Sequence, residues 1–302
     1  MIARAVFGTI RRPGALGLVW LTRLGFAWLV AGPVARALVA FGVLNHPRGD
    51  AVLFDAGGVW LAEAVRASLK AGAVEFRGAV VTGATLAWLG LIPLAGLMVA
   101  LRERPKHPLG LCLARAVAVF PRFTLLAGAT LFVQSVLGLG CLLASVVVHR
   151  RLPTSLSEPK ADLLALGVLA IGLLASLWIG IVEDLARAAV VNHDVGILSA
   201  IRHAFSSLAK RPFALIGSWS LFALIGWGVV LGAAFVTGVL DVSRSADIRV
   251  FAALLIHQTA AFACVATRAF WLSIALSEPS PTSDDKSEDS VAPVDPSPHP
   301  AA

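Results

Sequence analysis

The chain has 302 residues, of which 58% are hydrophobic and only 14% are charged. Soluble domains typically carry about 25% charged residues, so in water this composition would leave a large apolar surface exposed. The net charge of +7 comes from basic residues spread over short connections, which is typical of contact with lipid headgroups rather than nucleic acid. We therefore expect an all-α, polytopic membrane helical bundle whose main partner is the lipid bilayer.

Metal, redox and nucleotide chemistry find little support in the sequence. The three cysteines, Cys112, Cys141 and Cys264, are isolated and lie in or beside apolar runs. They lack the spacing of a zinc site or a disulfide framework, and no nucleotide-binding glycine motif or HExxH motif occurs. Gly217-Ser-Trp-Ser resembles a hydrolase elbow but lacks its second glycine. We predict no cofactor, no metal and no catalytic residue.

Apolar runs are the main organising feature of the chain. Each predicted span exceeds the roughly 20 residues that cross a hydrocarbon core, although Pro93 should kink the second. The rival view of the first run, a signal peptide cut after Ala35-Arg36-Ala37, is disfavoured by the length of the run and by Arg23. The six spans are expected at about 15–44, 79–101, 121–148, 162–190, 213–240 and 250–276, within one membrane domain of residues 1–276.

Amphipathic segments stand before several of the spans. Segments 1–12, 109–120 and 197–211 are each followed by a proline that opens a span. This similarity indicates either a threefold parallel repeat or chance likeness among segments rich in alanine, arginine and leucine. Residues 60–70 are a further candidate for an interfacial helix, and residues 277–302 form an acidic, proline- and serine-rich tail that we expect to be disordered.

The distribution of basic residues predicts the orientation. Lysine and arginine are more frequent in the N-terminal segment, the second and fourth connections and the tail than in the other connections. By the positive-inside rule, both termini should lie in the cytoplasm, and the protein should reside in a bacterial inner membrane.

Charges inside the predicted spans are the strongest candidates for a functional site, because each is costly in a membrane unless it is paired or reaches the interface. Arg23, Glu183, Asp184 and Arg268 should lie at similar depth. We expect Glu183 or Asp184 to pair with Arg23 or Arg268, and Glu183 to pair with Arg187 one turn along the helix. The alternatives are arginines that snorkel to headgroups and a path for substrate or protons.

Uncharged polar residues form a second candidate set. Gln134 in the third span and His257 and Gln258 in the sixth could line a cavity, or they could hydrogen-bond between helices. Small residues are expected to mark close helix packing, as at Gly138, Gly140, Gly226, Gly228 and Gly232.

Three phrases of the sequence carry a resemblance to a known group. They are Ala200-Ile-Arg-His-Ala-Phe-Ser-Ser-Leu-Ala-Lys-Arg-Pro, Asp55-Ala-Gly-Gly-Val-Trp-Leu-Ala-Glu-Ala and Glu183-Asp-Leu-Ala-Arg-Ala-Ala-Val-Val. Together with six spans and amphipathic segments, they resemble bacterial multi-pass proteins similar to the membrane domain of glycerophosphodiester phosphodiesterase. In that group the catalytic part is a separate soluble domain without counterpart here, so the resemblance implies an accessory membrane module and carries over no catalytic residues.

Two classes of function follow from these observations, with a third behind them. The first is a non-enzymatic module that organises lipid, a partner membrane protein or a soluble subunit. The second is a transporter of a small solute or lipid that uses the intramembrane charges, and the third is an intramembrane lipid enzyme. A continuous polar cavity would favour transport, whereas an apolar bundle would favour the module.

Overall fold

The structure is a computed structural model that describes residues 2–40, 74–102, 108–151, 158–239 and 247–278, with the single positions 63 and 66. The described residues are helical and contain no strand. Six helical segments are long and apolar enough to cross a membrane, so the predicted all-α polytopic fold is confirmed. The helices are α1 (Ile2–Ile10), α2 (Pro13–Ala40), α4 (Val74–Leu89), α5 (Leu91–Arg102), α6 (Leu109–Arg151), α7 (Glu158–His193), α8 (Ile197–Lys210), α9 (Pro212–Val239) and α10 (Asp247–Ala275).

Two boundaries differ from the prediction. The second span is broken at Gly90, between α4 and α5, rather than kinked at Pro93. Pro93 lies in the first turn of α5, where a missing N–H costs little. Residues 109–120 are not a separate helix, because α6 continues through Pro121. The predicted helix at 60–70 and the tail beyond residue 278 lie outside the described residues.

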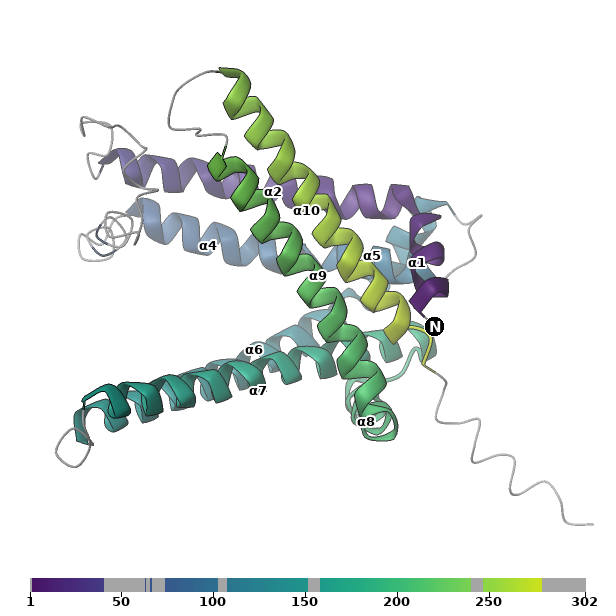
Figure 1. The fold of residues 1–302 in the computed structure, drawn as a ribbon. Coiled ribbons are helices and arrows are strands. Elements are labelled where there is room, and N and C mark those ends of the chain that lie inside the picture. The colour runs from purple at the N-terminus through teal and green to yellow at the C-terminus, as the bar shows by residue number, and fades with distance from the viewer. Residues whose placement is uncertain are drawn as a thin grey trace, which may run out of the picture.

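Consecutive spans pair into three helical hairpins within the described chain. α2 packs along α4, α6 along α7, and α9 along α10. Figure 1 shows the hairpins meeting at the end of the molecule that carries α1, α5 and α8, and diverging toward the other end. Because the two helices of a hairpin would cross the membrane in opposite directions, all three hairpins begin and end on the same side of the membrane.

The core lies at the end where the hairpins meet, which we call the convergent end. It is built from the first turns of α2, α6 and α9 and the last turns of α7 and α10, packed around α5 and α8. Its largest fully buried side chains include Phe123, Leu97, Met98, Leu215 and Trp271.

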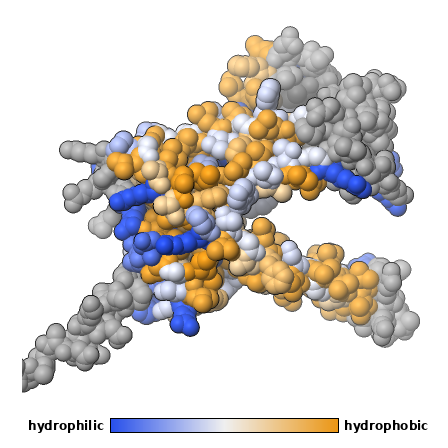
Figure 2. Space-filling view, turned by 180° about the vertical axis from the view of Figure 1, so that it is seen from behind, coloured by the Kyte–Doolittle hydropathy of each residue, from blue (hydrophilic) through white to orange (hydrophobic). Residues whose placement is uncertain are grey.

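The diverging halves of the hairpins expose apolar side chains instead. In α6 and α7 these include Phe132, Leu139, Leu143, Leu166 and Leu173, each more than half exposed. Figure 2 shows hydrophobic surface on both sides of the hollow that separates the α6–α7 hairpin from the rest of the molecule. Burial in protein therefore holds the convergent end together, while lipid is the natural solvent for the diverging halves.

Close packing within the α6–α7 hairpin depends on a glycine that the sequence pattern did not indicate. A Cβ atom on Gly172 would lie 2.5 Å from Cys141 Sγ and 3.0 Å from Cys141 Cβ. By contrast, nothing lies within 4 Å of an added Cβ at Gly138, Gly140, Gly228 or Gly232. Those four glycines are not close-packing positions in this structure.

The amphipathic segments at 2–10 and 197–210 form helices that end shortly before a proline, as expected. α8 ends at Lys210, and Pro212 begins α9. Ala204 and Leu208 of α8 are buried in the core, whereas Phe205 is exposed. Much of the apolar face of α8 therefore packs on protein, which ties the start of α9 to the end of α7.

Candidate intramembrane charge cluster and lateral grooves

Asp184 lies at the centre of the charged residues within the spans. It sits on α7 about nine residues before the helix ends at His193, and it is fully buried. The helical periodicity places Glu183, Asp184 and Arg187 within one turn of each other. The last turns of α7 thus carry two acids and a base into the core of the convergent end.

Both carboxylate oxygens of Asp184 accept hydrogen bonds from α10. Arg268 Nη2 lies 2.5 Å from Oδ1, and Trp271 Nε1 donates to Oδ2 over 2.8 Å. Arg268 and Trp271 are three residues apart, so they lie on one face of α10. A buried carboxylate is costly unless it is paired and hydrogen-bonded, and these two donors meet that requirement.

Arg187 connects the same cluster to α6. Its Nη2 atom lies 2.5 Å from Glu183 Oε1, and its Nη1 atom lies 3.9 Å from Asp184 Oδ1. The guanidinium carbon also sits 5.6 Å from the centroid of the Phe123 ring, a separation typical of cation–π contacts. The predicted pairs Glu183–Arg187 and Asp184–Arg268 are therefore both present.

Arg23 does not complete the cluster in the expected way. The described part of the structure gives its side chain no carboxylate partner, although it lies near enough to Arg268 for the two positive charges to repel. The side chain is exposed on α2. Of the two predicted arginine partners, only Arg268 pairs with an acid.

Positive charges outnumber negative ones among the five predicted cluster residues. With both carboxylates ionised, Glu183 and Asp184 supply two negative charges, while Arg23, Arg187 and Arg268 supply three positive ones. The group therefore carries one uncompensated positive charge inside the spans.

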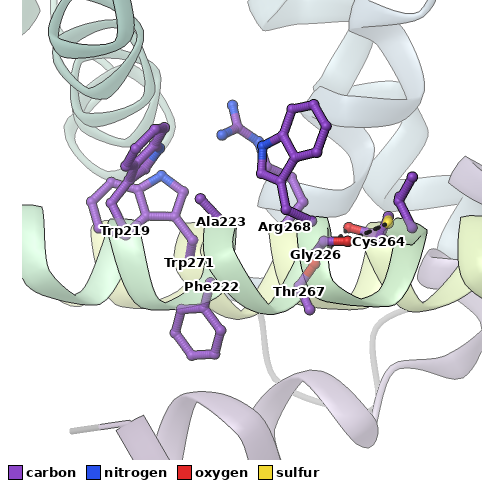
Figure 3. Close-up of a pocket in the computed structure, with 10 residues that line it drawn as sticks. Trp219, Phe222, Ala223, Gly226, Cys264, Thr267, Arg268 and Trp271 are labelled. Carbon is purple, nitrogen blue, oxygen red and sulfur yellow. Dashed lines mark hydrogen bonds between the residues drawn. The ribbon is translucent and has the colours of Figure 1, made fainter. Parts of the chain in front are cut away.

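A groove of about 360 Å³ runs between α9 and α10 beside this cluster. Arg268 is its single charged lining residue, and Figure 3 shows Arg268 and Trp219 projecting from the helix pair. Figure 3 also marks the hydrogen bond that Cys264 Sγ donates from α10 to the Gly226 carbonyl oxygen of α9 over 3.6 Å. The other lining residues are Phe222, Ala223, Trp227, Val230, Thr267 and Trp271.

A second groove, of about 250 Å³, lies between α2 and the junction of α4 with α5. Arg23 is its single charged lining residue, and Phe26, Gly90 and Pro93 are among the others. Each of the two grooves therefore combines an apolar wall with one arginine.

The predicted uncharged polar set is not gathered into either groove. Gln134 Nε2 donates to the Ser176 carbonyl oxygen over 3.1 Å, which joins α6 to α7. His257 is exposed and Gln258 is half-buried on α10. None of the three lines the two grooves, so Gln134 fits the interhelical alternative.

Further contacts, apart from the charge cluster, brace the convergent end. Arg122 forms an ion pair with Asp194, and Arg102 donates to the Val191 carbonyl oxygen. Asn192 Nδ2 donates to the Leu276 carbonyl oxygen over 2.7 Å. These contacts join the ends of α5, α7 and α10 and the start of α6, close to the buried cluster.

Sequence reasoning missed two features of the site. Trp271 was not singled out, although its position three residues after Arg268 could have indicated a shared partner. His193 and His203 also meet, with ring centroids 5.5 Å apart in an edge-to-face arrangement. Burial, followed by the nearby His193 and Lys210, lowers the pKa of His203 below its ordinary 6.5.

The part of the chain that the structure describes holds no group of three histidine, cysteine or acidic side chains that could bind a metal ion. Comparisons with protein-family models, curated proteins and solved structures found no match. The resemblance to the membrane domain of glycerophosphodiester phosphodiesterase stays a prediction. The six long apolar helices are those of a multi-pass membrane protein.

Proposed function

We propose that this protein is a non-enzymatic module of a bacterial inner membrane that holds phospholipid between its hairpins, with both termini in the cytoplasm. The observation that supports this most directly is the divergence of the hairpins. They share a packed core at the convergent end only, and their other halves present apolar side chains on several sides. Surface of this kind, between protein elements, is covered by acyl chains.

The grooves favour this module over a transporter of polar solutes. Each of the two described grooves is lined by apolar residues around one arginine. Lipid tails suit such walls, whereas a permeating polar solute needs several convergent polar groups. The basic and polar contacts at the convergent end would also suit a partner membrane protein or soluble subunit.

Spin-labelled phospholipid tests the proposal. The full chain is reconstituted into vesicles with a phospholipid labelled near the end of one acyl chain, and its electron paramagnetic resonance spectrum is recorded. We expect a motionally restricted population larger than the single shell around a compact six-helix protein of similar mass. A population equal to that of the compact control would contradict the proposal.

A lipid transporter is the second candidate, because the α9–α10 groove places an arginine beside a surface that acyl chains can reach. The two functions differ in lipid movement between leaflets. In proteoliposomes with fluorescent phospholipid, the module predicts transfer no faster than in protein-free vesicles and recovered lipid of unchanged mass. Faster transfer would favour the transporter, and altered lipid mass would favour an enzyme.

A further inference from the structure

The guanidinium of Arg268 contacts a buried partner and also faces an open groove. One nitrogen is bonded to Asp184, yet 36% of the side chain is exposed, and the residue lines the α9–α10 groove. A guanidinium has five N–H donors, and the described residues supply Asp184 as its acceptor. Donors remain for an acceptor that enters from the groove.

The electrostatics of the site favour an anion as that acceptor. Within the cluster, Glu183 and Asp184 balance Arg187 and Arg268. Arg23 on the neighbouring α2 supplies the one uncompensated positive charge, which acts on Arg268. In a low-dielectric membrane such a charge gains strongly from a counter-anion. A zwitterionic headgroup would bring its own cation toward two arginines, whereas a headgroup with only a phosphate charge would not.

The position of Arg268 matches a lipid phosphate. It lies seven residues before the end of α10 at Ala275, which is about 10 Å along the helix. That depth is within reach of a phosphate at the convergent-end interface, because arginine side chains extend toward headgroups. Trp219 and Trp227 flank the groove, and aromatic rings of this kind commonly lie at headgroup level and against acyl chains.

We propose that the α9–α10 groove binds one anionic phospholipid, with its phosphate oxygen accepting hydrogen bonds from Arg268 and one acyl chain lying along the aromatic wall. The groove is far smaller than a whole lipid, so it holds the phosphate, the glycerol and the start of one chain, and the remainder lies in the bilayer. This site rests on the proposed function, because it is one specific position within the lipid that the module holds.

Native mass spectrometry of the full chain tests the site. The protein is taken from nanodiscs of phosphatidylglycerol and phosphatidylethanolamine in equal amounts into mild detergent, and retained lipids are identified by mass. We expect one retained phosphatidylglycerol, in about tenfold excess over phosphatidylethanolamine, as for one charge-assisted hydrogen bond. Inorganic phosphate at millimolar concentration should not displace it, because the acyl chain contributes to binding.

Two pairs of variants separate the site from general effects. Arg268→Gln should abolish the preference for phosphatidylglycerol, whereas Arg249→Gln, which removes the same charge from an exposed position on α10, should retain it. Gly226→Leu fills the groove and leaves the Asp184–Arg268 pair intact, so it should also abolish retention. Gly228→Leu adds the same volume on α9 with no atom within 4 Å of its Cβ, and should behave as wild type.

The outcomes distinguish the site from the function on which it rests. Retention of lipid without a headgroup preference in the wild type, or an unchanged preference in Gly226→Leu, would overturn the site and leave the module standing. Retention of no phospholipid by the wild type would contradict the module itself. If Arg268→Gln does not fold, the comparison of Gly226→Leu with Gly228→Leu decides whether the groove binds the lipid.

Discussion

Asp184 of α7 and Arg268 of α10 form an ion pair of 2.5 Å, with Asp184 fully buried and Arg268 partly open to the α9–α10 groove. The pair joins two of the three hairpins at their convergent end. It therefore serves both the stability of the bundle and, in our proposal, the position of a lipid-binding guanidinium.

Asp184→Ala should destabilise the protein by about 3 kcal/mol, because it leaves Arg268 and Trp271 without their shared acceptor. This figure is the lower end of the range for buried pairs, since Arg268 is partly exposed. The measurement is the unfolding equilibrium in mixed detergent micelles. The double variant Asp184→Ala with Arg268→Ala should lose less stability than the sum of the single variants. Simple additivity would show that the two side chains are not coupled.

Trp271→Phe should lower the free energy of unfolding by about 2 kcal/mol, because it removes the hydrogen bond to Asp184 Oδ2 and leaves space in the core. Trp227→Phe is the matched control, since Trp227 lies on α9 with 66% of its surface exposed and should change stability by less than about 0.5 kcal/mol. Both are measured by the same unfolding equilibrium. Equal losses in the two variants would argue against a structural role for the Trp271–Asp184 bond.

Gly172→Ala should weaken the α6–α7 hairpin, because the added Cβ would lie 2.5 Å from Cys141 Sγ. We expect a loss of about 1–3 kcal/mol, as for overpacked cores. Gly167→Ala, where nothing lies within 4 Å of the new Cβ, is the control on the same helix. Adding Cys141→Ala should restore part of the loss by removing the sulfur. A Gly172→Ala protein as stable as the Gly167→Ala protein would contradict the close approach of the two helices.

The six spans and the pairing of Asp184 with Arg268 could be predicted because both follow from rules that need only the amino-acid sequence. A run of more than about 20 apolar residues has few alternatives to a spanning helix, and a buried acid needs a cation. The same rules gave two arginines as candidate partners, Arg23 and Arg268. The choice between them depends on how the hairpins pack, which periodicity does not encode.

Three-dimensional packing also explains why the predictions for the packing glycines and for Pro121 were partly wrong. Five glycines of α6 and α9 were expected at close contacts, and of these Gly226 does face a neighbouring helix, with an added Cβ 3.4 Å from Thr267 Oγ1. The tightest approach among the described residues falls instead at Gly172 of α7, because hairpin register decides which small residue faces a neighbour. Pro121 was expected to begin a helix, but α6 continues through it. A proline inside a spanning helix is tolerated where local adjustments satisfy the freed carbonyl group, and that depends on three-dimensional surroundings.

The contribution of His203 to stability should fall as the pH is lowered from about 7.5 to about 5.5. Burial lowers the pKa of His203 in the folded protein below 6.5, so below pH 6.5 the unfolded chain binds a proton that the folded protein resists. The contribution of His203 is therefore fully present above pH 6.5 and is lost as the pH falls toward the lowered value. The observable is the apparent melting temperature in detergent at the two pH values.

The comparison of His203→Asn with His257→Asn isolates this effect from other titrating groups. Burial raises the pKa of Glu278, so its contribution has the opposite sign, with stability decreasing as the pH rises from the unfolded pKa through the folded one. Because Glu278 is unchanged in both variants, it cancels in their difference. We expect a shallower loss of melting temperature on acidification in His203→Asn than in His257→Asn, whose side chain is exposed. Identical profiles in the two variants would remove His203, with its neighbours His193 and Lys210, as a source of the pH dependence.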